Sequence, residues 1–356
     1  MSSTTEAPVA GVSAERSGFL PDRIIHLHPT RLCNLACLHC YSTSAPREKG
    51  ALDPAVVCEA LGVLRAEGYA SVSLSGGEPL VYRPLREVVE GARELGYRVT
   101  MVSNGLLATE RRLLPVLSQL DGIAISFDGL AETHDAMRGR AGAFERACAA
   151  LARLASMGLP VGAAISLTRE AIPELPDLAD HLVGLGARSL QIRPVARAGR
   201  ARSLPDGTFN TPVDHARLYL VVLALQQELP VEVRVHCDLA PTQGLWEQRD
   251  AYVGLLGDCG GVPHESRPLA DLVNPLVITE TGALKPIAYD FDERFDVDSV
   301  HGLSAESLRE YKRERLPGLQ ELVGGALAGL REEHGLVDWF DHCTRLSEAD
   351  VPVLRG

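Results

Sequence analysis

Three cysteines within eight residues are the feature of this sequence with the clearest chemical meaning. Cys33, Cys37 and Cys40 give the spacing CxxxCxxC, directly after an apolar run that is typical of a strand. A [4Fe–4S] cube needs four ligands, and three local thiolates would leave one iron with an open position, where a substrate can coordinate. The alternative is a structural zinc site completed by His28, His39 or a distant cysteine, although such sites more often use two separated cysteine pairs.

Short apolar runs alternate with helix-like segments over residues 24–193, which is typical of parallel strands joined by helices. The predicted strands are Ile24–His28, Ser71–Ser75, Arg98–Ser103, Gly122–Phe127, Val161–Leu167 and Ser189–Arg193. The predicted helices are Pro54–Glu67, Pro84–Leu95, Glu110–Leu120, Ala143–Met157 and Ile172–Leu185. Six such units predict an α/β fold, either an open twisted sheet or part of a barrel. In both folds, ligands gather at the carboxyl ends of the strands.

The pattern changes after about residue 196. The predicted elements there are a helix at Asp214–Leu229, a strand at Val231–His236, a hairpin at Asn274–Ala288 turning at Thr281-Gly282, and a helical stretch at Glu306–Glu333 interrupted at Pro317-Gly318 and Gly324-Gly325. We therefore expect a disordered tail over residues 1–22, a core over 23–205 and a C-terminal region that caps the substrate over 206–356.

Charge and hydropathy exclude several classes of partner. The 35 Lys and Arg residues against 47 Asp and Glu residues give a net charge of −12, which repels phosphate backbones and anionic lipids. The uncharged stretch Leu154–Thr168 is too short to cross a bilayer. The N-terminal residues lack the basic start and apolar segment of a signal peptide. We expect a cytoplasmic protein that binds neither nucleic acid nor membrane.

The cysteine motif resembles the signature of radical S-adenosylmethionine (SAM) enzymes, and further motifs follow in the order typical of that family. The run LSGGEPL ends the second predicted strand and is similar to the family's GGE motif. By this resemblance, Gly76 and Gly77 let the backbone approach the methionine part of SAM, and Glu78 accepts from its ammonium group. Ser103 and Asn104 belong to a segment similar to the family's T/SNG turn, which would line the same cofactor site.

Two more segments, SFDG and HDAMRG, resemble the branch whose members usually carry a C-terminal SPASM or twitch extension. The resemblance implies that Ser126 and Asp128 lie near the ribose, and Arg138 near the cofactor carboxylate or the substrate. The alternative for Arg138 is a solvated charge at a helix end. His39 takes a position that is usually aromatic, so its ring would pack on adenine, and Ser166 would meet the adenosine part.

The resemblance implies a partial (β/α)6 barrel with a small C-terminal α+β twitch-like extension. Its cofactors would be one [4Fe–4S] cluster and SAM, and an external donor such as a flavodoxin or ferredoxin would supply the electron. Reductive cleavage of SAM would give a 5′-deoxyadenosyl radical that abstracts a hydrogen atom from the substrate. Because such a radical attacks almost any C–H bond, the protein must orient the target carbon and exclude water.

The predicted extension departs from its relatives at the position where a cluster-binding cysteine is expected after the hairpin glycine. That position holds Ile287, and no cysteine occurs between residues 260 and 342. We infer a hairpin without the usual auxiliary cluster. Cys237, Cys259 and Cys343 could still meet in space, but scattered cysteines are more often small buried hydrophobes. Without an auxiliary electron outlet, redox-neutral outcomes such as decarboxylation, epimerisation or rearrangement gain weight.

A redox-neutral reaction needs a hydrogen donor and residues that hold the substrate. Cys259, beside two glycines on a predicted loop, is the first candidate donor and Cys237 the second, although an inert thiol is the commoner role. The candidate substrate-binding residues are Arg193, which would also meet the adenosine part, Arg197, Arg200 and Arg202.

Three functional hypotheses follow. The first is a radical SAM enzyme of natural-product biosynthesis that tailors a small sugar or nucleoside-like metabolite. The second is a maturase that modifies a ribosomally synthesised peptide. About twenty residues precede the first predicted strand, too few for an N-terminal peptide-binding domain, which weighs against it. The third is a non-enzymatic iron–sulfur or zinc protein.

Overall fold

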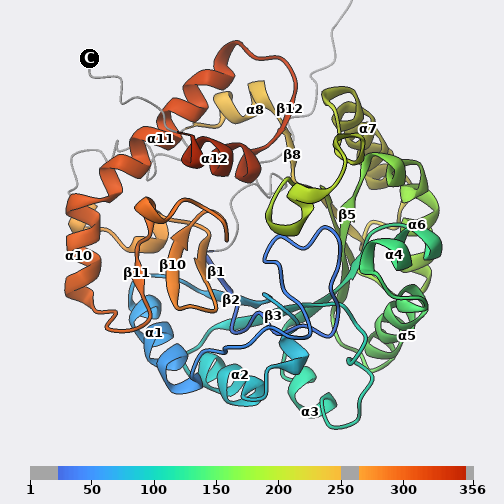
Figure 1. Cartoon of the computed structure of the whole chain (residues 1–356), viewed down its shortest axis with the longest axis horizontal. Coiled ribbons are helices and arrows are strands. Elements are labelled where there is room, and N and C mark those ends of the chain that lie inside the picture. Colours follow the sequence, from blue (N-terminus) through green and yellow to red (C-terminus); the bar gives the residue numbers. More distant parts are fainter. Residues whose placement is uncertain (1–22, 250–263, 350–356) are drawn as a thin grey trace, which may run out of the picture.

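A ten-stranded sheet organises the chain, and helices cover its outer face (Figure 1). The computed structural model describes residues 23–249 and 264–349. The spatial order of the strands is β11 (Asp298–Ser299), β10 (Ala283–Pro286), β9 (Leu276–Ile278), β1 (Ile24–Leu27), β2 (Ser71–Leu74), β3 (Arg98–Ser103), β4 (Gly122–Phe127), β5 (Val161–Leu167), β6 (Ser189–Pro194) and β7 (Arg234–Cys237). Strands β1 to β7 are parallel neighbours, which confirms the predicted partial-barrel fold.

The helices between these strands bury the outward-facing side chains. They are α1 (Pro54–Ala66), α2 (Leu85–Glu94), α3 (Leu114–Leu117), α4 (Ala131–Arg138), α5 (Ala143–Ser156), α6 (Leu175–Gly184) and α7 (Pro212–Glu228). Strand β4 shows the alternation that decides which side chains face them. Ile123, Ile125 and Phe127 are buried against the helices, whereas Ala124 and Ser126 face the barrel interior and are only half-buried.

The C-terminal region continues the same sheet. Strand β9 pairs in parallel with β1, placing Leu276 opposite Ile25 and Ile278 opposite Leu27, and β10 returns antiparallel to β9 as the predicted hairpin. The remaining elements are β8 (Leu239–Pro241), which pairs with β12 (Leu336–Asp338), and the helices α8 (Thr242–Glu247), α10 (Ala305–Glu314), α11 (Leu316–Gly329) and α12 (Trp339–Glu348). These helices close the ring on the side of the hairpin (Figure 1).

Two predicted helix boundaries are wrong for physical reasons. The helix expected at Glu110–Leu120 shrinks to the single turn α3, because Pro115 at its start has no N–H to continue the helix backward. The break expected at Gly324-Gly325 is absent, since α11 runs through it and buries Leu319, Val323 and Leu327 at helical spacing. Packing of an apolar face outweighs the low helix propensity of two glycines.

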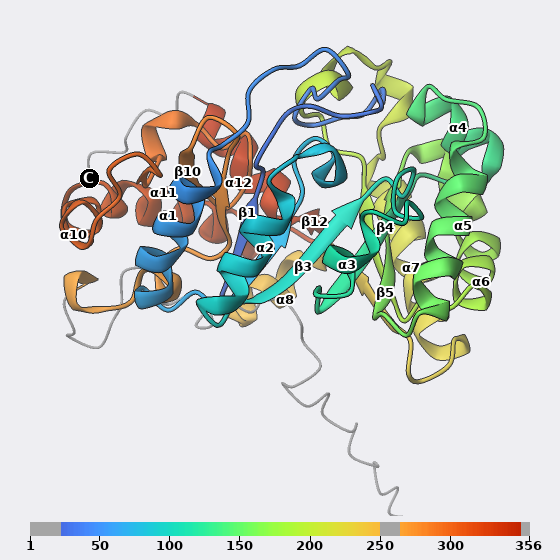
Figure 2. The ribbon, with the colours of Figure 1, turned by 90° about the horizontal axis from the view of Figure 1, so that it is seen from below.

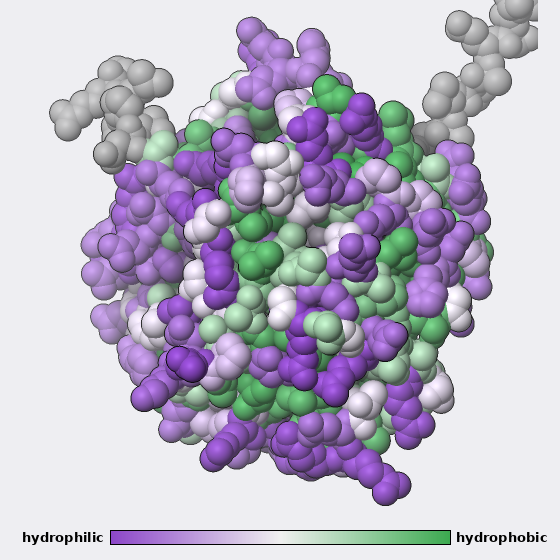
Figure 3. All heavy atoms as spheres, turned by 45° about the vertical axis from the view of Figure 1, so that its right-hand side comes forward, coloured by the Kyte–Doolittle hydropathy of each residue, from purple (hydrophilic) through white to green (hydrophobic). Residues whose placement is uncertain are grey.

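None of the described helices is long and apolar enough to cross a membrane. On the face shown in Figure 3, polar and charged side chains form most of the rim, and apolar side chains gather toward the middle.

Candidate active site at the carboxyl ends of the strands

The loop that carries the three cysteines crosses the carboxyl end of the sheet (Figure 2). We call residues 29–50 the cysteine loop, and apart from two isolated β-bridges it has no regular secondary structure. Cys33 and Cys37 are buried in a small apolar cluster with Leu35, and Cys40 packs against this cluster. All three are free thiols. The loop therefore brings the predicted ligands together.

The surroundings of the thiols fit an iron–sulfur cluster better than a single metal ion. Across residues 23–249 and 264–349, no three His, Cys, Asp or Glu side chains are arranged to hold one ion. In a cube, each thiolate binds a different iron, so the sulfur atoms stand farther apart than the ligands of one zinc ion. Burial raises the pKa of the Cys33 thiol to about 12, whereas a bound metal centre would deprotonate it. The N–H groups of Leu35 and Asn104 point at its sulfur and suit a thiolate.

The GGE segment packs directly against the cysteine loop. The backbone N–H of Gly77 donates to Thr30 O (2.8 Å), and that of Glu78 donates to Leu32 O (3.0 Å). A Cβ on Gly77 would collide with the carbonyl of Leu32. Glycine is thus required here for the approach of two protein loops, in addition to the predicted approach to SAM.

The carboxylate of Glu78 joins the ends of β2 and β3. It accepts hydrogen bonds from Ser103 Oγ (2.8 Å), Asn104 N (2.9 Å) and Leu80 N (3.1 Å), and only 1% of the residue is exposed. Asn104 Nδ2 in turn donates to Asn34 Oδ1 of the cysteine loop (2.7 Å). The predicted residues Glu78, Ser103 and Asn104 therefore form one network beneath the thiols.

A second buried carboxylate, at the end of β4, gathers the other predicted residues. Asp128 accepts from Arg138 Nε (2.5 Å) and Nη2 (3.0 Å), and it lies 3.1 Å from His39 Nε2. Arg138 Nη1 lies 3.8 Å from Cys37 Sγ. Burial alone would raise the pKa of Asp128, but Arg138, His39 and His134 together outweigh burial and hold the pKa below its usual range. Arg138 is itself buried, so it is not the solvated helix-end charge considered above.

The remaining predicted cofactor residue faces the barrel interior. Ser166 on β5 lies opposite Arg193 on β6, and both alternate with fully buried apolar neighbours. Ser126 on β4 also faces the interior, opposite Ala164 of β5. These side chains line the interior below the cysteine loop, where a cofactor or substrate would meet them.

Two further carboxyl groups stand beside Arg193. Asp238, which follows β7, lies 3.3 Å from Arg193 Nε and 3.4 Å from His236 Nε2. Asp338, at the end of β12, accepts from backbone N–H groups in the first turn of α12. Burial, together with the charge of Asp238, raises the pKa of Asp338 to about 7. This side of the interior therefore contains one ionised and one readily protonated carboxyl group.

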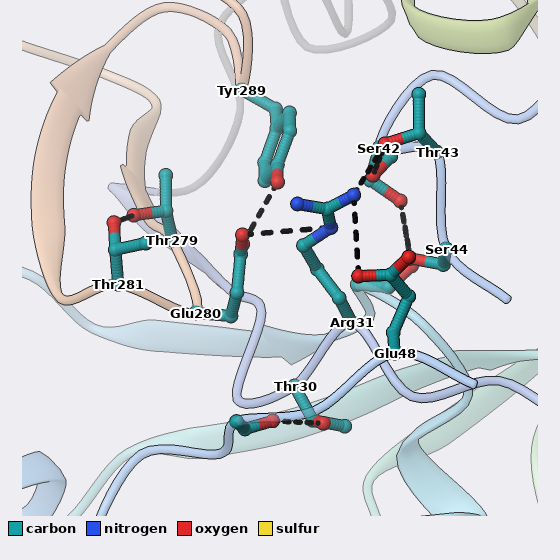
Figure 4. A network of polar contacts seen from close by, with 12 residues as sticks. Thr30, Arg31, Ser42, Thr43, Ser44, Glu48, Thr279, Glu280, Thr281 and Tyr289 are labelled. Atoms are coloured by element: carbon teal, nitrogen blue, oxygen red, sulfur yellow. Dashed lines mark hydrogen bonds and ion pairs between the residues drawn. The ribbon is translucent and has the colours of Figure 1, made fainter. Parts of the chain in front are cut away.

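The hairpin of the C-terminal region reaches the cysteine loop (Figure 4). Arg31 Nε lies 3.8 Å from Glu280 Oε1, and its Nη2 donates to Thr43 Oγ1 (2.6 Å) and lies 3.5 Å from Glu48. The hydroxyl of Tyr289 donates to Glu280 Oε2 (2.8 Å).

Aromatic rings extend this contact. The ring of Tyr289 stacks on His28 with centroids 4.9 Å apart, and Tyr41 meets it edge-on at 5.5 Å. Ile287, at the position where a cluster-binding cysteine was expected, is buried with a positive φ of 67°. In this chain, the hairpin therefore touches the cysteine loop through an ion pair and rings.

Three of the arginines predicted to bind substrate have other partners. Arg197 pairs with Asp206 (2.7 Å), and Arg202 pairs with Glu348. Arg200 donates to backbone carbonyls of the cysteine loop. Arg193 remains the one whose side chain belongs to the barrel interior.

The candidate hydrogen donors lie elsewhere or outside the described part of the chain. Cys259 falls within residues 250–263, outside the described residues. Cys237 and Cys343 are buried near Asp338, and burial raises the pKa of both thiols. Cys259 therefore stays a prediction.

Sequence reasoning missed Glu280, Tyr289 and Asp238. No local motif marks them, and only the pairing of β9 with β1 and of β7 with β6 brings them to the site. The one available signal was the occurrence of acidic and aromatic residues beside the predicted hairpin and strand.

Comparison with known proteins agrees with this geometry. The profile of the radical SAM superfamily matches residues 27–182, which contain the cysteine loop, the GGE segment and the Asp128–Arg138 pair. The chain contains a radical SAM domain. The predicted cofactors, a [4Fe–4S] cluster and SAM, are those of this family.

Three curated proteins are similar to this chain in sequence. The sporulation killing factor maturation protein SkfB of Bacillus subtilis is 30% identical over 53% of this chain and 46% of its own length. The antilisterial bacteriocin subtilosin biosynthesis protein AlbA of the same organism is 29% identical over 78% of this chain and 57% of its own length. Pre-heme d1 synthase of Dinoroseobacter shibae is 30% identical over 55% and 48%, respectively. The chain thus spans about half the length of the relatives it matches.

Among solved structures, Streptococcus suis SuiB bound to its precursor peptide SuiA has a similar fold. The TM-score is 0.64 at 14% identity, and the match covers 85% of this chain and 67% of SuiB. At this identity, the likeness shows the fold alone.

Replacing Asp128 by Asn should destabilise the apo radical SAM domain by about 3–5 kcal/mol, since Arg138 would stay buried without its counter-charge. Chemical unfolding at pH 7 measures this change. Glu90→Gln is the matched control, because it removes only an exposed charge beside Arg86, its amide oxygen can still accept from Gln119, and it should cost below about 0.5 kcal/mol. Equal small losses in both variants would contradict the buried-pair assignment.

Replacing Asp338 by Asn should flatten the dependence of stability on pH. A raised pKa means that the folded chain holds this proton more tightly, so the stabilisation is full at acid pH and is lost as pH rises through about 7. Asn keeps the helix cap and removes the repulsion with Asp238 while Arg193 and Asp341 stay in place. At pH 8, the variant should be more stable than wild type by on the order of 1 kcal/mol. If the free energies of unfolding of wild type and variant changed with pH in the same way between pH 4 and 8, the raised pKa of Asp338 would be refuted.

Proposed function

We propose that this chain is a radical SAM enzyme that modifies a ribosomally synthesised peptide. The observation that carries the enzymatic part is the convergence of three free thiols, the GGE segment and the Asp128–Arg138 pair at one end of the barrel. The peptide substrate is supported by the names of two relatives, a sporulation killing factor maturation protein and a bacteriocin biosynthesis protein. These names give no support to the sugar or nucleoside substrate considered first.

The chain's own residues divide the task. Cys33, Cys37 and Cys40 would hold the cluster, and the bound cluster and SAM supply a 5′-deoxyadenosyl radical. Glu78 and Asp128 fix the loops around the cofactor. The half-buried inward faces of β4 to β6 leave room for the substrate beside them, and the C-terminal helices limit the access of water.

The proposal also includes an external electron donor and a hydrogen donor. An external flavodoxin or ferredoxin would deliver the electron. A hydrogen donor such as the Cys259 thiol would return a hydrogen atom to the substrate radical, and the electron donor would reduce the thiyl radical that this leaves.

A small-molecule substrate is the second candidate. It is favoured by the similarity to pre-heme d1 synthase, whose named product is a tetrapyrrole precursor. The two candidates share the site and differ in what enters the barrel.

Replacing Cys33, Cys37 and Cys40 together by Ala should abolish the brown colour and the cleavage of SAM to 5′-deoxyadenosine and methionine. Iron should fall from about four per chain to near zero after anaerobic reconstitution. Cys58→Ala is the control, since this thiol lies on α1 away from the loop and its loss should leave the iron content unchanged. A four-iron cluster that persists in the triple variant would refute the ligand assignment, and about eight iron per chain would reveal a second cluster.

The peptide substrate is tested by incubating the reduced, reconstituted protein and SAM with short peptides encoded beside its gene. The proposal expects 5′-deoxyadenosine formation above the rate without peptide, and a mass change in one peptide by mass spectrometry. A matched set of tetrapyrrole and sugar substrates is run in parallel. A mass change in one of these small molecules, and in no peptide, would refute the peptide substrate and support a small-molecule substrate.

A further inference from the structure

One arginine gathers the backbone carbonyls of the cysteine loop. Arg200 lies on the 3-10 helix η4 (Gly199–Ser203), directly after β6. Its guanidinium donates to Cys37 O from Nε (2.8 Å), to Thr43 O from Nη1 (3.3 Å) and to Ser44 O from Nη2 (2.8 Å). Its own backbone N–H donates to Cys40 O (2.9 Å). Four carbonyls of an irregular loop therefore accept hydrogen bonds from one residue, and two of them, Cys37 O and Cys40 O, also accept from within the loop.

The residue before it allows this close approach. Gly199 has a positive φ of 50°, and a Cβ there would collide with the carbonyl oxygens of Cys40 and Tyr41. Any other amino acid would have to push η4 away from the cysteine loop. Gly199 thus allows the backbones to approach closely, and Arg200 supplies the hydrogen-bond donors.

The loop also contains a conformation that it would not adopt on its own. Thr43 has a positive φ of 55°, which is rare for a β-branched residue and costs on the order of 1–3 kcal/mol. Such a residue persists only where its surroundings hold it. Arg200 binds the carbonyl of Thr43, and Arg31 binds its hydroxyl.

We propose that Arg200 is a positioning residue that holds the cysteine loop in its cluster-binding shape before the cluster arrives. The planar guanidinium can donate in several directions at once, which an ammonium group cannot match. The cluster-binding role of the loop rests on the proposed function. The assignment replaces the earlier expectation that Arg200 binds substrate.

The first test needs no cluster. Hydrogen exchange of the loop segment 37–44 is measured in the apo chain for wild type and Arg200→Met. The proposal expects exchange of the loop amides at least about tenfold faster in the variant, because the loop opens more often once its carbonyls lose their charge-assisted hydrogen bonds. Exchange in α10, at the edge of the ring away from the cysteine loop (Figure 1), should stay unchanged. Equal exchange of the loop in both proteins would overturn the proposal.

The second test follows iron release to a chelator after anaerobic reconstitution. Arg200→Met should release iron at least about tenfold faster than wild type, and Arg200→Lys should lie between the two. Arg202→Met is the matched control on the same 3-10 helix, where the side chain pairs with Glu348 at the surface. Its release rate should equal that of wild type.

Gly199→Ala disturbs the same contact without changing Arg200, because the added Cβ collides with the loop carbonyls. This second variant keeps the test valid if circular dichroism shows that Arg200→Met is misfolded. It should speed both exchange and iron release. Exchange and iron release at wild-type rates in both Arg200→Met and Gly199→Ala would refute the positioning role of Arg200. The two proposals can fail separately. If wild type bound no iron, but Arg200→Met still sped exchange in the loop, the proposed function would be refuted and the positioning role of Arg200 would stand.

Discussion

The cysteine loop has to keep three thiols in place without the hydrogen-bond ladder of a helix or a sheet. An irregular segment at a buried site must find partners for its backbone elsewhere, and each unpaired polar group would cost stability. Here the partners come from three sides. The GGE loop donates N–H groups to Thr30 and Leu32, Arg200 donates to the second half of the loop, and the hairpin ion pair holds Arg31. The geometry of the active site is therefore a property of the loop's neighbours.

Two buried carboxylates connect that loop to the barrel. Glu78 binds the ends of β2 and β3 together, and Asp128 joins the end of β4 to α4 and to His39. Each carboxylate is satisfied by donors from separate elements, which makes the relative position of the strand ends part of one network. Each carboxylate can be buried because it is hydrogen-bonded or ion-paired, and each links segments that the sheet alone would leave independent.

The regular part of the fold was predictable because its signals are local. The predicted bounds of β3, β4 and β5 coincide with the observed ones, since short apolar runs between helix-like segments mark them in the sequence. The motif residues were found for the same reason. The partners Glu280, Asp238 and Asp338 were not, because their position depends on pairings such as β9 with β1 that no short pattern encodes. Arg200 was noticed only for its charge, and its carbonyl contacts appear once the chain is folded.

The pairing of β9 with β1 has a consequence for biosynthesis. Ile24 N donates to Asn274 Oδ1 across 250 residues, so the strand that precedes the thiols is completed by a segment synthesised much later. Domains tend to fold from the N-terminus as they leave the ribosome, but β1 can pair with β9 only after β9 has been synthesised. The nascent thiols are thus presented to oxidants and stray metal ions before their final neighbours exist, which favours delivery of iron and sulfide to the finished chain.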